Sequence, residues 1–311
     1  MAPLILWLVL FVVSLFVLVK SSDHFTTAAE KIGVHFRIPS FVVGVTLVAV
    51  GTSLPELASS LMAVFSDSSE VVSGVVIGSN ISNLLLVIGV CAIISKFIKL
   101  SWNIEHIDLP FLIASAFFLF ITMGDGVFTY VEGIVGLVLY IIYSNYVIST
   151  RKHRTSNALV SCKLDYKVVF TLIVSCFFIW AGAKYTIISL LEISSLMNIG
   201  KEIIALSAVA LGTSLPELSV SVLAAIKKNS EMAVGNIVGS NIFNSLVVMG
   251  IPSLFSTLYV TKSIIAVSLP MMVIFTLFFY FIVRDKEITQ WEGMILIVFY
   301  LLFLGNIFGI M

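Results

Sequence analysis

The chain contains ten long, mostly apolar segments, and this succession restricts its fold more than any other feature. They lie at 3–20, 39–65, 71–95, 107–123, 126–148, 167–190, 200–226, 232–257, 262–283 and 290–310. A helix of about 20 apolar residues is long enough to cross a bilayer. Only 11% of the residues are charged, against roughly 25% in ordinary soluble domains. The sequence therefore predicts an all-α polytopic membrane protein with ten transmembrane helices.

One hexapeptide occurs twice in the chain. Gly-Thr-Ser-Leu-Pro-Glu at 51–56 returns letter for letter at 212–217, and Gly-Ser-Asn-Ile-Ser-Asn at 78–83 returns with one change at 239–244. Both motifs recur at one constant offset, that from Glu56 to Glu217, which we call the repeat offset. It is far longer than the roughly 20–50 residues of a solenoid repeat, so the chain is expected to be a duplicated unit. The predicted parts are 1–150 with its motif region 44–90, a basic linker at 151–166, and 167–311 with its motif region 205–251.

Each unit has an odd number of spans, so the second unit must enter the membrane from the opposite face. We therefore expect two inverted five-helix repeats, a pattern typical of secondary transporters. The loops on one side carry 14 Lys and Arg residues, whereas those on the other side carry only Lys201 and Lys262. The positive-inside rule places the basic side in the cytoplasm. The prediction is a multi-pass protein of the plasma membrane with both termini outside.

The repeated hexapeptide places a carboxylate and a proline at membrane depth. Glu56 and Glu217 would each cost about 2.5–3.5 kcal/mol at the bilayer centre, which a bound cation or proton would offset. Pro55 and Pro216 have no N–H, so helices 2 and 7 are expected to be broken there. Carbonyls freed at this depth are tolerated where they line a cavity. The alternatives are a protonated glutamate bonded to a neighbouring helix and a simple kink.

Hydroxyl and amide side chains recur at helical spacing around these glutamates. Residues four apart share a helix face, which pairs Thr52 with Glu56, Thr213 with Glu217, Ser79 with Asn83 and Ser240 with Asn244. Such oxygen ligands, without sulfur or imidazole, suit Ca²⁺, Na⁺ or Mg²⁺. Gly74 and Gly78, repeated as Gly235 and Gly239, would allow helices to approach closely, which is also compatible with packing alone.

These paired motifs resemble the two alpha-repeats of the sodium/calcium exchanger family within the calcium/cation antiporters, prokaryotic type, over essentially the whole chain. The resemblance implies Na⁺/Ca²⁺ antiport by alternating access, normally extruding Ca²⁺, with the first and sixth spans sliding across the bundle. It implies calcium ligation by Glu56 and Glu217, with oxygens from Thr52 and Thr213. For the flanking sodium sites it implies Ala49 and Ala210 carbonyls with Ser53, Ser214, Ser79 and Ser240, and it puts Asn83 and Asn244 at the centre.

The chain departs from the family pattern in three ways. Some relatives carry Asp at one central position, whereas this chain has Asn83 and Asn244, so two ionised carboxylates give the site a charge of −2. That charge balances one Ca²⁺. The second-half residue Asn236 is matched by Val75 in the first half. The basic linker is too short to hold calcium-sensing domains, so regulation of that kind is not expected.

Two other transport functions stay open. A proton-coupled Ca²⁺/cation antiporter is the first alternative; that branch typically carries a different, Gly-Asn-containing motif, although H⁺ could compete at the shared carboxylates. A cation channel is a minor alternative. Net charge is zero, and hydrolase and nucleotide-binding motifs are lacking, so we expect no enzyme activity, cofactor or nucleic-acid partner. The expected partners are Na⁺, Ca²⁺ and the lipid bilayer, and the expected state is a monomer.

Overall fold

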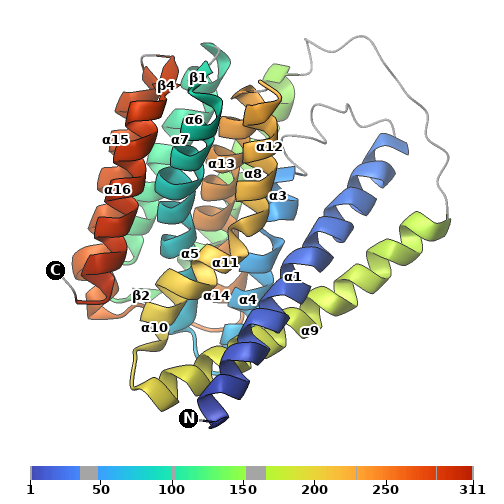
Figure 1. Ribbon diagram of the computed structural model, residues 1–311, viewed down its shortest axis with the longest axis vertical. Coiled ribbons are helices and arrows are strands. Elements are labelled where there is room, and N and C mark those ends of the chain that lie inside the picture. Colours follow the sequence, from blue (N-terminus) through green and yellow to red (C-terminus); the bar gives the residue numbers. More distant parts are fainter. Residues whose placement is uncertain are drawn as a thin grey trace.

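The computed structural model describes residues 2–35, 48–99, 102–151, 166–228, 230–284 and 286–309, and most of them are helical (Figure 1). Among these residues, seven helices are long and apolar enough to cross a membrane. They are Leu4–Phe25, Glu70–Ser95, Tyr130–Val147, Tyr166–Met197, Met232–Ser253, Ile264–Arg284 and Gln290–Ile307. A bent pair, Lys201–Thr213 and Leu215–Ile226, makes an eighth candidate span with a 41° bend. The prediction of a helical multi-pass membrane protein is confirmed.

The order of elements in the first half returns in the second half. The first half consists of α1 (Ala2–His35), α3 (Val48–Thr52), α4 (Leu54–Phe65), α5 (Glu70–Ser82), the π-helical turn η2 (Asn83–Val87), α6 (Ile88–Ser95), β1 (Phe97–Lys99), α7 (Trp102–Thr122), β2 (Val127–Phe128) and α8 (Tyr130–Arg151). The second half begins with α9 (Tyr166–Met197), α10 (Lys201–Ile204), the π-helical turn η4 (Ala205–Val209), α11 (Ala210–Thr213), α12 (Leu215–Ile226), α13 (Ser230–Phe243) and the π-helical turn η5 (Asn244–Val248). It ends with α14 (Gly250–Ser253), β3 (Leu258–Tyr259), the π-helical turn η6 (Ile264–Ser268), α15 (Leu269–Arg284), β4 (Glu287–Thr289) and α16 (Gln290–Ile307). The repeat offset converts the bounds of α4 into those of α12, and those of η2 into those of η5.

Four short strands correct the prediction of an all-α fold. β1 pairs with β4 and β2 pairs with β3, both antiparallel. The repeat offset relates the two pairings. Adding it to residue numbers in β1 gives residues in β3, and subtracting it from residue numbers in β4 gives residues in β2. Ile98 opposite Ile288 thus corresponds to Tyr259 opposite Val127. The backbone needs hydrogen-bond partners where the helices end, and each half finds them in the other half.

Several helix ends differ from the predicted spans. α1 continues to His35 and α9 to Met197, well past the spans predicted at 3–20 and 167–190. Hydropathy identifies only the part of a helix that lies within the bilayer. No proline interrupts either extension, so both helices continue beyond the bilayer. The span predicted at 126–148 starts as strand β2 and becomes helical only at Tyr130. Residues 39–47 of the second predicted span lie outside the described residues.

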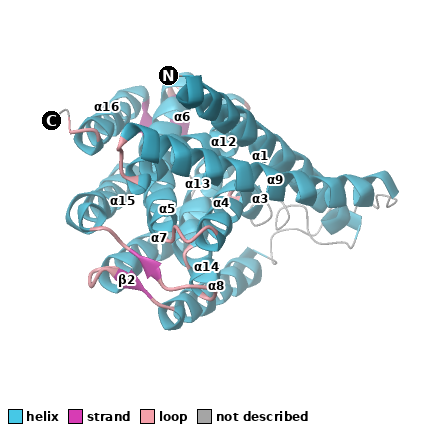
Figure 2. Cartoon of the chain, turned by 90° about the horizontal axis from the view of Figure 1, so that it is seen from below, coloured by secondary structure: helices cyan, strands magenta, loops and turns pink. Residues whose placement is uncertain are grey.

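Helices α1 and α9 lie side by side along one edge of the bundle (Figures 1 and 2). Gly182 of α9 permits this contact, because a Cβ atom at Gly182 would lie 2.8 Å from the backbone nitrogen of Leu18. Thr186 Oγ1 also donates a hydrogen bond to Ser14 Oγ at 3.1 Å. In Figure 1 the N-terminus lies at the bottom of the molecule and the C-terminus lies at the lower end of α16, both on the side away from β1 and β4.

The centre of the bundle is formed by α5 and α13 (Figure 2). Every residue from 71 to 85, and every residue from 233 to 250, is buried. A Cβ atom at Gly78 would lie 2.7 Å from the Ala210 methyl carbon and would overlap the Leu206 carbonyl, and one at Gly239 would lie 3.0 Å from the Ala49 methyl carbon. Each central helix therefore touches the broken span of the opposite half through a glycine, consistent with the predicted close approach.

This contact predicts that Gly78→Ala destabilises the fold. The added methyl group would overlap main-chain and side-chain atoms of the opposite half, and overpacking of this kind costs about 1–3 kcal/mol. Thermal unfolding of the purified protein in detergent measures the effect. Gly124→Ala is the matched control, because its nearest neighbours lie 3.5 Å away. Equal unfolding temperatures for the two variants would contradict the proposed packing.

Candidate cation site

Both copies of the hexapeptide form a break between two helices. Ser53 separates α3 from α4 with φ −89° and ψ 9°, and Ser214 separates α11 from α12 with φ −79° and ψ 3°. Each proline falls in the first turn of the new helix, where a missing N–H removes no helical hydrogen bond. Glu56 and Glu217 also lie in these first turns, where the helix dipole favours negative charge.

All twelve residues predicted to form the site are buried. None of them exposes more than 4% of its surface, and Glu56 and Glu217 are fully buried. The twelve residues are Ala49, Thr52, Ser53, Glu56, Ser79, Asn83, Ala210, Thr213, Ser214, Glu217, Ser240 and Asn244. Isolated carboxylates are rarely buried without a partner. Their joint burial inside a membrane bundle therefore indicates a site and not a surface feature.

Hydrogen bonds between the halves bring most of these residues together. Ser53 Oγ in the first half donates to Glu217 Oε1 in the second half at 2.9 Å. Glu217 also has the hydroxyls of Thr52 and Ser240 beside it. Glu56 accepts from Ser79 Oγ at 3.3 Å and has the hydroxyl of Thr213, from the opposite half, beside it. Each carboxylate is therefore surrounded by hydroxyl groups from both halves.

Several buried oxygen atoms of the site have no hydrogen-bond partner among the described residues. They are Glu56 Oε2, Glu217 Oε2, Asn83 Oδ1, Asn244 Oδ1 and Ser214 Oγ, and the amide nitrogen of Asn244 also has no partner. Buried polar atoms nearly always have a partner. A cluster of unpartnered oxygens with two carboxylates fits a hard cation. Among the described residues, no group of three or more His, Cys, Asp or Glu forms another candidate metal site.

The sequence analysis missed a network of asparagines that links the central helices. Asn83 Nδ2 donates to Asn241 Oδ1 at 3.0 Å, and Asn241 Nδ2 donates to the Asn80 carbonyl at 3.1 Å. Asn80 Nδ2 in turn donates to Ser245 Oγ at 2.8 Å. Asn80 and Asn241 belong to the repeated motif, and their identical positions within it were the available signal. This network joins α5 to α13.

The two central asparagines also begin π-helical turns, which the sequence analysis did not predict. Asn83 is the first residue of η2, and Asn244 is the first residue of η5. Turns of this kind often occur at functional sites in helices, because they shift side chains and carbonyls relative to a regular helix. The matched positions make the two turns equivalent parts of one site. The fold and site thus define a multi-pass membrane protein with a buried cluster of oxygen atoms of the kind that hard cations prefer.

Comparison with known proteins places the chain in a family. The family described as sodium/calcium exchanger protein matches residues 6–149 and 167–309. Sodium/calcium exchanger MaX1 of Methanosarcina acetivorans is 32% identical over 94% of this chain and 96% of MaX1. Inner membrane protein YrbG of Escherichia coli is 29% identical over 79% of each chain. The chain belongs to the sodium/calcium exchanger family, whose members are secondary transporters and not enzymes. The resemblance inferred from the motifs is confirmed.

Solved structures agree with this assignment. A structure of the sodium-calcium exchanger NCX_Mj, soaked with Na⁺ and Sr²⁺, is similar with a TM-score of 0.68 and 31% sequence identity. The similarity covers 96% of this chain and 98% of that chain. A second structure of NCX_Mj gives a TM-score of 0.69. The fold is therefore shared over nearly the whole length of both proteins.

The asparagine network predicts that Asn241→Leu destabilises the protein. The change would leave the buried amide of Asn83 without its acceptor, and an unsatisfied buried group costs about 1–3 kcal/mol. Thermal unfolding in detergent without added Ca²⁺ measures this cost. Ser149→Ala on α8 serves as the control, because this serine is exposed and bonds only within its own helix. An unchanged unfolding temperature in Asn241→Leu would argue against the network.

Proposed function

We propose that the chain exchanges Na⁺ for Ca²⁺ by alternating access and normally moves Ca²⁺ out of the cell as Na⁺ flows inward. The observation that carries this proposal is the set of unpartnered buried oxygens around Glu56 and Glu217. Family membership and the similarity to NCX_Mj support the choice of ions.

In this proposal, Ca²⁺ binds between the two glutamates, whose combined charge of −2 it would balance. Asn83 and Asn244 contribute neutral oxygens at the centre, together with Thr52 and Thr213. Na⁺ binds beside the carbonyls of Ala49 and Ala210, with the hydroxyls of Ser53, Ser214, Ser79 and Ser240. Ca²⁺ takes six to eight oxygen ligands in proteins, which this set can supply. The empty, ionised site would cross the bilayer poorly because an unpaired charge is costly there, and this couples the two ions.

We further propose that the transporter has ten spans arranged as two inverted five-span repeats. The first unit is 1–150, the linker is 151–166 and the second unit is 167–311. Support comes from elements that recur at the repeat offset and from the exchanged strand pairing between the halves. Two termini at the same end of the molecule also fit an even number of crossings (Figure 1).

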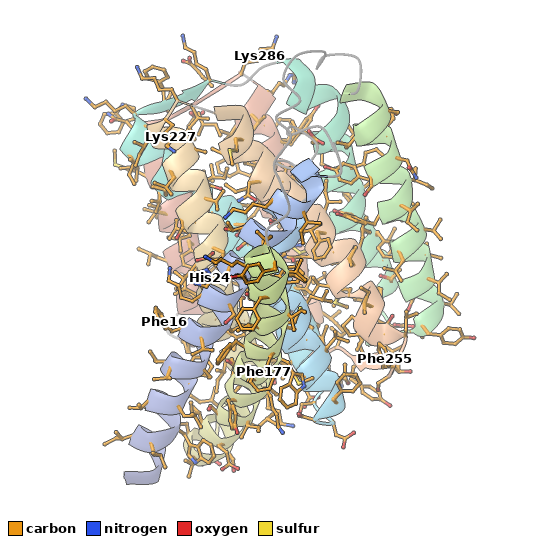
Figure 3. The ribbon with its side chains drawn as sticks, turned by 90° about the vertical axis from the view of Figure 1, so that its right-hand side faces the viewer. Phe16, His24, Phe177, Lys227, Phe255 and Lys286 are labelled. Atoms are coloured by element: carbon orange, nitrogen blue, oxygen red, sulfur yellow. The ribbon has the colours of Figure 1, made fainter. Side chains whose placement is uncertain are left out.

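The proposed location is the plasma membrane, with both termini outside and the protein acting as a monomer. Lys227 and Lys286 lie toward one end of the molecule, whereas the apolar Phe16, Phe177 and Phe255 lie farther toward the other end (Figure 3). The termini lie at the end opposite β4, the strand next to Lys286 (Figure 1). Basic residues favour the cytoplasmic side, which supports this orientation.

Calcium uptake into proteoliposomes tests the exchange. We expect ⁴⁵Ca²⁺ uptake by the wild type to follow an imposed Na⁺ gradient, and Glu56→Gln and Glu217→Gln each to abolish it, because each removes one of the two charges. Glu192→Gln on α9 is the matched control, since that glutamate is exposed and uptake should be retained. Near-normal uptake in either site variant would remove the basis of the proposal.

The same assay separates the alternatives. Uptake that follows a pH gradient and ignores Na⁺ would identify a proton-coupled antiporter. Ca²⁺ flux without any counter-ion would identify a channel.

Labelling of single cysteines tests the orientation. The native Cys91, Cys162 and Cys176 are first replaced by Ser, and a cysteine is then introduced by Phe255→Cys or Lys286→Cys. Both original side chains are solvent-accessible. In intact cells, we expect a membrane-impermeant maleimide to label the first variant and not the second. Lys286→Cys should react only after permeabilisation. The reverse pattern would invert the proposed topology.

A further inference from the structure

The two halves of the site differ at one buried position. It is occupied by Asn236 in the second half and by Val75 in the first half, and the repeat offset relates the two. Each lies four residues before the site serine of its own helix, Ser240 or Ser79, and therefore on the same helix face as that serine. One side of the site thus has an amide group next to it, whereas the other side has an isopropyl group.

Asn236 connects the two halves through both ends of its amide. Its Oδ1 accepts a hydrogen bond from Thr52 Oγ1 at 3.4 Å, and its Nδ2 donates to Ser221 Oγ at 3.1 Å. Thr52 Oγ1 also lies 3.3 Å from the Ala49 carbonyl oxygen and 3.3 Å from Ser240 Oγ. Three site oxygens, from Ala49, Thr52 and Ser240, therefore converge beside Asn236.

The equivalent positions next to Val75 have different partners. Thr213 corresponds to Thr52, and its hydroxyl donates to the carbonyl of Val209 at 3.0 Å or to that of Ala210 at 3.3 Å. Ser60 corresponds to Ser221, and its buried hydroxyl has no partner among the described residues. The isopropyl group of Val75 can accept no hydrogen bond, so the acceptors near the Thr213 hydroxyl are carbonyls of its own helix and the Glu56 carboxylate.

The position of one proton decides how many oxygens are free to bind a cation. A threonine hydroxyl has one proton and two lone pairs. When Thr52 donates to Asn236, its own lone pairs are available to a cation, and it no longer competes with the Ser53 N–H and the Ser240 hydroxyl for the Ala49 carbonyl. Thr213 has no amide acceptor of this kind, so its proton competes either for a main-chain carbonyl, including that of Ala210, or for the Glu56 carboxylate, and both of these are proposed ligands.

We propose that Asn236 is a positioning residue that makes the side formed by Ala49, Thr52 and Ser240 the tighter of the two flanking Na⁺ positions. The inference rests on the proposed function, because it assumes that Na⁺ binds on both sides of the glutamates. Thr52 is shared with the proposed Ca²⁺ ligands, but Ala49 and Ser240 are assigned to Na⁺ alone, so the effect on Na⁺ is larger than the effect on Ca²⁺.

Reciprocal substitutions test the role of this position. Asn236→Val gives the second half the side chain of the first half. We expect the Na⁺ concentration for half-maximal exchange to rise about three- to tenfold, the effect of losing one neutral hydrogen bond, while half-saturation by Ca²⁺ changes less. Val75→Asn should lower the Na⁺ requirement. Ser219→Ala, exposed on α12 and bonded within that helix, is the control and should leave both values unchanged.

A double-mutant cycle tests whether Asn236 acts through Thr52. Adding Asn236→Val to Thr52→Val should produce no further loss of Na⁺ affinity, because the hydroxyl that Asn236 orients is already gone. Na⁺-dependent thermal stabilisation of the purified protein without Ca²⁺ gives the same comparison without transport. A purely structural role would instead lower the unfolding temperature equally at all Na⁺ concentrations.

The outcomes separate this inference from the proposed function. A wild type without Na⁺-dependent Ca²⁺ exchange would overturn both. A wild type that exchanges, with Na⁺ dependence unchanged in Asn236→Val or with Na⁺ and Ca²⁺ shifted equally, would overturn only the role of Asn236. If Asn236→Val does not fold, Val75→Asn decides the question, and an unchanged Na⁺ requirement in that variant overturns the inference.

Discussion

The structure depends on the burial of two carboxylates, Glu56 and Glu217, in the middle of a membrane bundle. The effective penalty for burying an ion in a protein is several kcal/mol. Among the described residues, neither glutamate forms an ion pair, and their side-chain partners are hydroxyl groups. Hydroxyls satisfy hydrogen-bonding capacity but carry no positive charge. Neutralisation by a cation or a proton from outside the described residues would remove this cost, which is the property that an ion carrier requires.

The broken spans place opposite ends of helices next to this charge. Both glutamates lie in the first turn of a new helix, at the end that favours anions. The preceding helices α3 and α11 end at Thr52 and Thr213, and the C-terminal end of a helix favours cations. A continuous helix could provide only one of these environments at this depth. The break after each Thr supplies both, and it occurs twice because the unit is duplicated.

The sequence predicted most of what was local or repeated, and little of what depended on contact between the halves. The breaks at Pro55 and Pro216 and the burial of the twelve residues followed from hydropathy, proline chemistry and motif spacing. The exchanged strands and the bond between Asn83 and Asn241 did not, because they depend on how α5 packs against α13 in three dimensions. The π-helical turns at Asn83 and Asn244 were also missed, since a helix with one extra residue in a turn has nearly the same hydropathy as a regular one. The length of α1 was missed because membrane thickness does not set the end of a helix.

The departures from the repeat are as informative as the repeat itself. If two inverted halves were identical, the states open to either side of the membrane would be equal in energy, since the two-fold axis would interconvert them. Any preference between those states must therefore come from residues that differ between the halves. One such difference at the site lies beside α4 and α12, where Val75 leaves Ser60 without a partner among the described residues while Asn236 bonds Ser221. Ser59, also unpartnered, corresponds to Val220 in the second half. The first half thus holds unsatisfied hydroxyls where the second half is either bonded or apolar. Unsatisfied hydroxyls gain most from contact with water or ions, so this difference favours hydration along α4 over hydration along α12 and makes the two faces of the site inequivalent.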